Sequence, residues 1–226
     1  MTTEEKEILE KKIDNEIVDS LCPFIKSAFK LMEEDNNSEF TYAYLLLLAT
    51  GIERLQKIIY VLKKVNDEGT IPSENNLRKL SHNIVKTHQN KIKPILDTEK
   101  LFKDEEDILN QGLTIITNII MELRYANFDF VNPESFDIPS HLVKIIEEGK
   151  FAFEQNVDYV HISRNILNLI LKKYITSLVD LIWHKKANSD IEIYPNCLKE
   201  FITKGYLELD LNVEIQNIID KENFDA

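Results

Sequence analysis

The feature that most constrains the fold is a long apolar stripe at helical spacing within residues 39–66. Its members recur at steps of three and four residues, so they share one face of a helix. They are Leu45, Leu48, Ile52, Leu55, Ile59 and Leu62. Residues 45–49 are apolar on all sides, as is typical of a helix at the centre of a bundle. The chain has only 5 glycines and 6 prolines in 226 residues, which favours few, long helices over many short strands.

The same spacing predicts further helices on both sides of this one. We expect them at about 3–34, 73–94, 104–127 and 140–186, with a short one after Pro195. Residues 205–211 alternate between apolar and polar, which predicts either a short strand or an extended tail packed on the helices. The predicted fold is therefore a single all-α domain over residues 1–226, an antiparallel bundle of long helices with a short extended C-terminal segment.

Cysteine use and hydropathy bear on where the protein resides. Cys22 and Cys197 are far apart and form no Cys-x-x-Cys pair, so we expect neither a disulfide framework nor a zinc site. A reduced, cytoplasmic protein fits this pattern best. Residues 1–6 are acidic and open a helix, which argues against a signal peptide. Charged side chains interrupt the apolar stretch 165–183, which predicts a buried helix and no membrane span.

Charge is distributed unevenly along the chain. The formal net charge is −12, yet residues 54–103 carry 11 basic and only 5 acidic side chains. A basic region of this kind attracts RNA, a nucleotide or an acidic partner surface. The alternative is that its cations pair with the acidic remainder, within one chain or across a dimer.

Arginine is scarce among these cations. Only four of the 27 basic residues are arginine, namely Arg54, Arg78, Arg124 and Arg164. Arginine is the better residue where a planar, always-charged group must meet a carboxylate or a phosphate. Each of the four therefore indicates either a structural salt bridge or a functional contact.

One arginine and two histidines fall in the basic helix expected at 73–94. Arg78 and His82 are one helical turn apart on an exposed edge, whereas His88 lies in the apolar stripe and is expected to be packed. His82 would serve as a general acid or base, and Arg78 would stabilise negative charge developing on phosphorus. The alternative is that Arg78 pairs with an acidic neighbour and His82 marks a helix boundary.

Two stretches in this region resemble the front half of HEPN-type domains. Residues 51–59 read Gly-Ile-Glu-Arg-Leu-Gln-Lys-Ile-Ile on a long apolar helix, and residues 77–84 read Leu-Arg-Lys-Leu-Ser-His-Asn-Ile. In the family, a central helix with acidic and basic residues precedes a helix bearing a Leu-x-x-Gly-His-like signature. Residues 122–128, Glu-Leu-Arg-Tyr-Ala-Asn-Phe, are similar to some members too. The resemblance covers residues 40–130, with 139–226 as additional helices packed on that part.

The resemblance implies a helical bundle that commonly forms homodimers and often handles RNA or nucleotides. Several branches of the family are ribonucleases of host-defence or toxin–antitoxin systems, and they use an arginine separated from a histidine by four to six residues. Here only three residues separate Arg78 from His82. A divergent ribonuclease would use Glu53, Arg78 and His82, whereas a non-catalytic member would keep only the binding surface.

The residues expected to bind RNA or a nucleotide are Arg78, Lys79, Lys86 and Lys91. The aromatic residues are scattered at helical spacing and read as core, so the basic region lacks exposed aromatics for stacking single-stranded bases. The rival hypothesis is a non-enzymatic helical interaction module, whose basic region docks an acidic protein partner or a second copy of the chain.

A weaker hypothesis is a metal-dependent bundle enzyme. Asp158 with His161, and Asp180 with His184, each place a carboxylate and an imidazole on one helical face. Di-metal helical bundles need repeated Glu-x-x-His motifs, and this chain has none, so two Asp–His hydrogen bonds are expected instead. With no glycine-rich phosphate loop in the sequence either, we expect no metal and no cofactor.

Overall fold

The computed structural model describes residues 1–34, 41–80, 82–126, 159–188, 190–193, 195–201 and 204–225. All regular structure in these ranges is helical, which confirms the all-α prediction. The α-helices are α1 (Thr3–Glu16), α2 (Cys22–Glu34), α3 (Thr41–Glu68), α4 (Glu74–Lys79), α5 (Ile84–Thr87), α6 (Lys93–Thr98), α7 (Glu106–Ala126), α9 (Tyr159–Trp183), α10 (Asn196–Lys199), α11 (Lys204–Glu208) and α12 (Leu211–Asp225). Two π-helical turns, η1 (Ile17–Leu21) and η2 (His88–Ile92), join α1 to α2 and α5 to α6.

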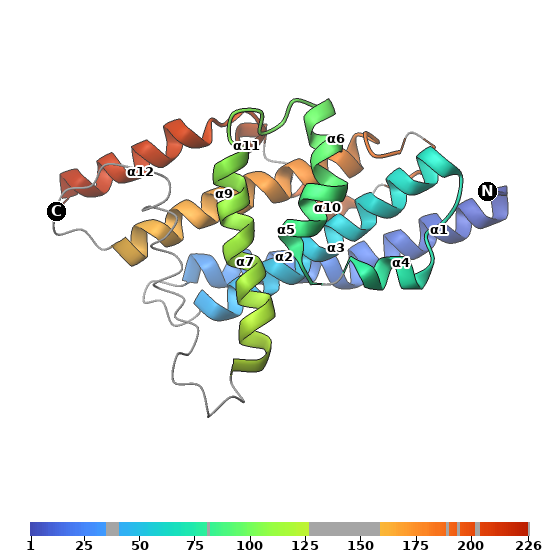
Figure 1. Cartoon of the computed structure of the whole chain (residues 1–226), viewed down its shortest axis with the longest axis horizontal. Helices are drawn as coiled ribbons and strands as arrows, with labels where there is room; N and C mark the ends of the chain where they lie inside the picture. The colour runs from blue at the N-terminus through green and yellow to red at the C-terminus, as the bar shows by residue number, and fades with distance from the viewer. Residues whose placement is uncertain are drawn as a thin grey trace.

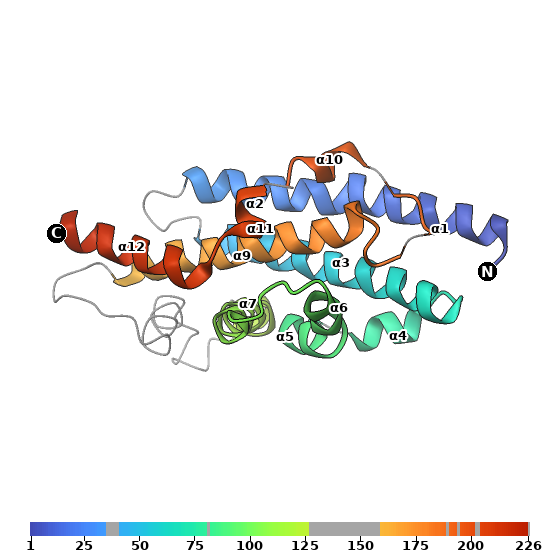
Figure 2. The same cartoon turned by 90° about the horizontal axis from the view of Figure 1, so that it is seen from above.

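The helices form three layers. α3 and α9 lie in the middle, with α1 and α2 on one side and the segment from α4 to α7 on the other (Figure 2). α1 and α2 run opposite to α3 and α9, and α12 runs opposite to α9 (Figure 1). α7 crosses α3 and α9 at a steep angle (Figure 1). The antiparallel arrangement therefore holds for α1, α2, α3, α9 and α12, which run along the long axis of the molecule, and does not extend to α7. The segment from α4 to α7 therefore forms the outer layer on the side of the middle layer opposite α1 and α2.

The first layer is one long helical rod. Thr2 caps its start, because its hydroxyl accepts from the Glu5 backbone N–H while the Glu5 carboxylate accepts from the Thr2 N–H at 2.7 Å. This reciprocal arrangement satisfies two N–H groups that a helix start otherwise leaves unpaired. Pro23 is the second residue of α2, where its missing N–H costs little, so the rod continues through η1 as the sequence indicated.

The apolar stripe of the sequence is the centre of the core. Its six residues on α3 are all buried, and one continuous cluster of buried apolar side chains extends from α1 to α12 within the described residues. α9 is buried around almost its whole circumference. Its charged Lys173 pairs with the buried Glu105, and Glu105 also accepts from the Leu211 backbone N–H at the start of α12. In the part of the chain that the structure describes, no helix is long and apolar enough to cross a membrane.

Two predictions about local structure are wrong. Residues 204–208 are helical and belong to α11, and 211 begins α12, so the extended C-terminal segment does not form. The single basic helix over 73–94 is instead interrupted: α4 ends at Lys79 and α5 begins only at Ile84. Pro94 does not end a helix but lies in the first turn of α6, where proline is well tolerated.

The expectation of two free cysteines is also contradicted. Cys22 of α2 and Cys197 of α10 are joined by a disulfide, with their Cα atoms 6.2 Å apart. The bond connects positions 175 residues apart in sequence, which is why spacing alone gave no indication of it. It fastens the chain that follows α9 to the first layer of the bundle.

The helices expected at 39–66 and 104–127 are α3 and α7, whose ends differ from the expected ones by one or two residues. Of the helix expected at 140–186, the structure describes α9, and the expected start at 140 lies outside the described residues.

Close packing of α2 against α3 depends on Gly51. A Cβ atom added there would lie 2.7 Å from Cγ1 of Ile25, whereas one added to Gly205 of α11 would meet nothing within 4 Å. Both glycines are helical, and alanine is the better helix former by about 1 kcal/mol. Only Gly51→Ala introduces an overlap that a packed core must absorb.

We therefore expect Gly51→Ala to lower the free energy of unfolding by about 1–2 kcal/mol through overpacking. Gly205→Ala is the matched control and should leave that free energy unchanged or slightly higher. Urea denaturation followed by circular dichroism measures both. Equal effects of the two substitutions would show that α2 and α3 do not approach closely at Gly51.

Candidate functional site

The basic region forms an outer layer built from short helical pieces. Ser73 caps α4 by accepting from the Asn76 backbone N–H, and Asn83 caps α5 by accepting from the Lys86 N–H at 2.8 Å. Asparagine and serine favour such caps over helix interiors, because their side chains replace a missing backbone partner. The caps explain why the helical pattern of the sequence is broken between Lys79 and Ile84.

A buried polar network holds this layer to the middle layer. Tyr174 of α9 donates its hydroxyl proton to Nδ1 of His88 at 3.0 Å and accepts from the Gln56 amide of α3 at 2.9 Å. Gln56 also donates to the backbone carbonyl of Ile84. His88 is fully buried, which confirms that it belongs to the packed stripe. Two helices of the middle layer and the outer layer therefore meet at one set of hydrogen bonds.

Burial determines the protonation of this network. It lowers the pKa of His88, and the nearby Glu106 carboxylate, 3.4 Å from Nε2, only partly offsets that effect. Burial also raises the pKa of Tyr174 far above its usual range. The imidazole is thus neutral and the phenol protonated at neutral pH, as the hydrogen-bond pattern requires.

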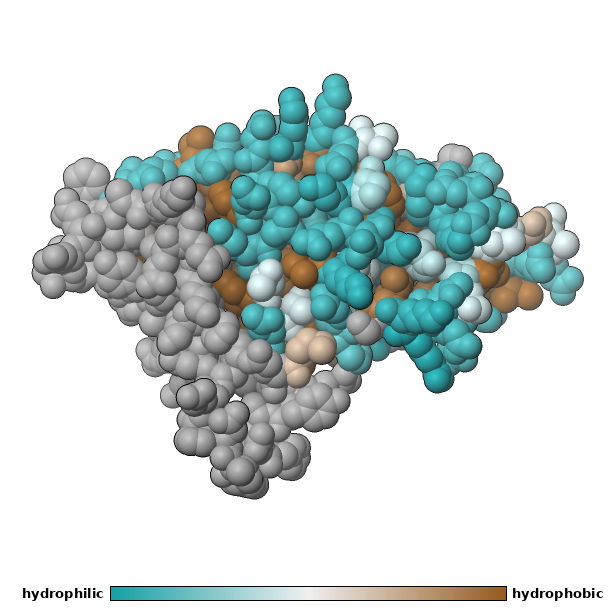
Figure 3. All heavy atoms as spheres, in the orientation of Figure 1, coloured by the Kyte–Doolittle hydropathy of each residue, from teal (hydrophilic) through white to brown (hydrophobic). Residues whose placement is uncertain are grey.

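Three lysines of the predicted binding set line one groove on the outer face. Lys79, Lys86 and Lys91 surround a hollow of about 440 Å³, together with Tyr60 of α3 and the polar Asn76 and Asn90. Lys91 Nζ lies 5.5 Å from the centre of the Tyr60 ring. In the space-filling view of the α4–α7 face, hydrophilic residues cover most of the described surface and hydrophobic ones show in small groups (Figure 3). We call this hollow the lysine groove.

The lysine groove carries positive charge that the rest of the described chain does not neutralise. No acidic residue lines it, and no carboxylate among the described residues pairs with Lys79, Lys86 or Lys91. Six other cations of the basic region are in ion pairs, namely Arg54, Lys57, Lys63, Lys64, Arg78 and Lys93. Lys100 and Lys103 are exposed and, like the three groove lysines, have no ion pair with a described carboxylate. What distinguishes Lys79, Lys86 and Lys91 is that they converge on one groove.

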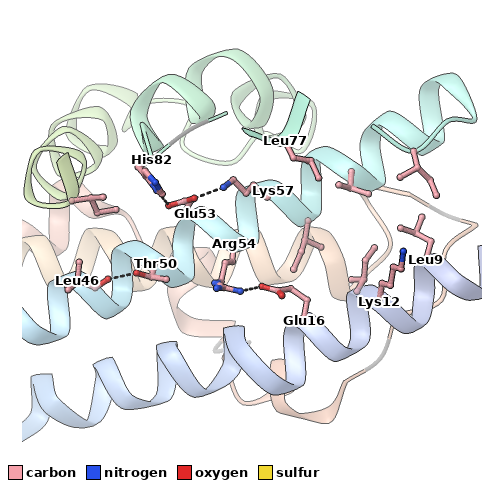
Figure 4. Close-up of a pocket in the computed structure, with 15 residues that line it drawn as sticks. Leu9, Lys12, Glu16, Leu46, Thr50, Glu53, Arg54, Lys57, Leu77 and His82 are labelled. Carbon is pink, nitrogen blue, oxygen red and sulfur yellow. Dashed lines mark hydrogen bonds and ion pairs between the residues drawn. The ribbon is translucent and has the colours of Figure 1, made fainter. Parts of the chain in front are cut away.

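Two of the three proposed catalytic residues lie together. Nδ1 of His82 is 2.8 Å from a Glu53 carboxylate oxygen, and Lys57 binds the other oxygen of that carboxylate. Figure 4 shows His82 and Lys57 pointing at Glu53 from opposite sides. Burial alone would raise the pKa of Glu53, but the hydrogen bonds from Lys57 and His82 outweigh it and hold the pKa below its usual range. Glu53 is thus an ionised carboxylate that orients the imidazole.

Arg78 lies apart from this pair. Its guanidinium binds Glu74 at 2.7 Å on the surface of α4, with about three quarters of the side chain exposed. It does not line the cavity that Glu53 and His82 share. Because α4 ends before His82, the shared exposed edge expected for Arg78 and His82 does not exist.

The histidines near the C-terminal half are in structural hydrogen bonds. His184 Nδ1 contacts Asp180 at 2.7 Å, as the spacing predicted, and Lys186 contacts the second oxygen of the same carboxylate. Asp158, the expected partner of His161, lies outside the described residues. Within them, His161 contacts Arg164 and Asn165, each at 3.0 Å. In the described ranges, no group of three His, Cys, Asp or Glu side chains is placed to hold a metal ion.

Sequence reasoning missed Tyr60. Tyr60 lies within the basic region, but on α3 and about thirty residues before Lys91, so no local pattern indicated that its ring faces the lysines. Its position on α3 outside the apolar stripe was the one sequence feature that indicated an aromatic ring away from the core.

Comparison with known proteins finds no match: no family model, no curated protein and no solved structure is similar to this chain at a significant level.

Neutral His88 makes stability depend on pH in a defined direction. Its folded-state pKa is below the unfolded value of 6.5, so the unfolded chain binds the extra proton first as pH falls. The free energy of unfolding should therefore decrease as pH falls from 7.5 through 6.5 to 5.5. In His88→Gln, which keeps a polar side chain but cannot titrate, this decrease should be smaller. Urea denaturation across that range measures it, and identical pH profiles would contradict the account.

Proposed function

We propose that the protein binds single-stranded RNA through the lysine groove. The observation that carries the proposal is the convergence of three lysines without ion-pair partners among the described residues on one groove that has no acidic lining. Phosphates supply the negative charge that such a groove complements, and lysines bind them as flexible point charges. Tyr60 supplies the ring on which a base would stack, and the two asparagines supply hydrogen bonds.

For RNA binding, the positive charge of the lysine groove matters more than the net charge of −12. At an ionic strength of about 0.15 M, exposed charges more than about 8 Å apart are largely screened. A phosphate within the groove thus interacts chiefly with Lys79, Lys86 and Lys91. The acidic remainder lowers non-specific binding elsewhere on the surface, so RNA is directed to this groove.

The resemblance to HEPN-type domains is part of the same proposal. It implies RNA or nucleotide engagement by a homodimer, and a cytoplasmic location is consistent with RNA as ligand. The Cys22–Cys197 disulfide is more typical of an oxidising compartment and does not support that location. A divergent ribonuclease is the second candidate function, favoured by one observation, the hydrogen bond that orients His82 on the ionised Glu53.

Binding of a fluorescent uridine 10-mer tests the main proposal. Removing one phosphate contact should weaken binding several-fold in low salt and make the slope of log affinity against log salt shallower by about 0.7. Lys86→Ala should show this change. Lys103→Ala removes an exposed lysine of the same basic region that does not line the groove, so it should leave affinity and slope unchanged.

Tyr60→Ala should weaken binding of the same RNA about tenfold or more, whereas Tyr60→Phe keeps the ring and the affinity.

Two results would contradict the proposal. Equal effects of Lys86→Ala and Lys103→Ala would show that the groove is not the binding surface. Absence of binding at 50 mM salt would favour the rival interaction module, in which the same lysines dock an acidic protein surface.

The ribonuclease candidate is tested separately by comparing cleavage of the same RNA by wild type and His82→Ala. If His82 is a general acid or base, its loss should reduce the rate by about 100-fold or more while binding to the lysine groove persists. Equal cleavage by both proteins, or none by either, would exclude catalysis by His82.

A further inference from the structure

A second and larger cavity lies over α3, between α1 of the first layer and residues of the outer layer, and it shares no lining residue with the lysine groove. Its volume is about 590 Å³, within the range of small-molecule sites in proteins. α3 forms its floor and α1 one wall, while Leu77 of α4 and His82 form part of the other (Figure 4). This cavity has a polar middle and an apolar end, and the two parts differ in what they can bind.

The apolar end lies between the start of α1 and the end of α3. Six aliphatic side chains line it: Leu9, Ile13, Ile58, Val61, Ile71 and Leu77. Ile71 is 47% exposed, although it lines a cavity whose other aliphatic residues are buried or half-buried. An aliphatic chain placed here would remove this surface from water, which is the main favourable term for binding an apolar ligand.

The charged groups of the polar middle are already matched. Arg54 bonds Glu16 across the cavity, and Lys57 and His82 both bond Glu53 (Figure 4). A ligand with a cationic head would therefore find both lining carboxylates engaged. The remaining charge is Lys12 of α1, which lies at the rim beside Leu9. No carboxylate among the described residues pairs with it.

We propose that this cavity binds an aliphatic carboxylate of about eight to twelve carbons. The chain occupies the apolar end, and the carboxylate pairs with the ammonium of Lys12. The pairing at the rim is solvent-exposed and contributes modestly, so the chain supplies most of the affinity and Lys12 supplies the selectivity for an anion. Each further buried methylene should tighten binding about fourfold.

Isothermal titration of the full-length protein with octanoate, decanoate and decylammonium, below their micelle concentrations, tests the proposal. Decanoate, with two more methylenes, should bind about 16-fold more tightly than octanoate, and decylammonium several-fold more weakly than decanoate. Lys12→Glu should weaken decanoate binding about fivefold or more without weakening that of decylammonium. Lys11→Glu makes the same charge change at an exposed neighbour that does not line the cavity, so it should bind decanoate like wild type.

Both substituted lysines are exposed, and circular dichroism verifies that the variants keep the wild-type helix content. Lack of decanoate binding, equal affinity for octanoate and decanoate, or equal affinity for decanoate and decylammonium would overturn the proposal. So would equal effects of Lys11→Glu and Lys12→Glu, which would show only a general effect of net charge.

Discussion

The buried hydrogen bonds of His88, Tyr174 and Gln56 are the interaction on which the arrangement of the basic layer depends. They join α3, α9 and the start of η2 at one point, where water is excluded. A buried polar group without a partner costs roughly 1–3 kcal/mol, so displacing these three side chains from one another is unfavourable. With His88 directed inward, Lys86 and Lys91 on either side of it are exposed to solvent. One buried imidazole thereby orients the lysine groove.

Much of the fold was predictable because it rests on helical spacing. The stripe on α3, the burial of α9 and the inward position of His88 follow from periodicity, which records which residues must leave water. The break between α4 and α5 was not predictable in this way. Asn83 caps a new helix, and Thr87 donates its hydroxyl to the Leu80 carbonyl, so local side-chain bonds override a continuous apolar pattern. The Cys22–Cys197 bond depends on contacts between distant segments, which no local pattern contains.

In the candidate sites too, features set by local sequence were predictable and features set by contacts between distant segments were not. The sequence identified Lys79, Lys86 and Lys91 by local charge, but Tyr60 enters the groove only because α3 lies beneath it. Glu53 and His82 meet as hypothesised, whereas Arg78 is paired with Glu74, in line with the structural alternative for the scarce arginines. Arg54 is likewise in a structural pair with Glu16, although that pair lines the larger cavity. Arg54 and Arg78 thus stand in ion pairs, and the cations of the lysine groove are lysines without an ion pair among the described residues.

The central claim is that Lys79, Lys86 and Lys91 form one surface for RNA. Acetylation of the folded protein's lysines, with and without a uridine 10-mer, tests this claim without any substitution. The protein is then digested, and mass spectrometry of the peptides measures the extent of acetylation at each lysine. The account predicts that RNA protects these three lysines while the exposed Lys100 and Lys103 of the same basic region react as before. Equal protection of all five lysines, or protection of none, would contradict it.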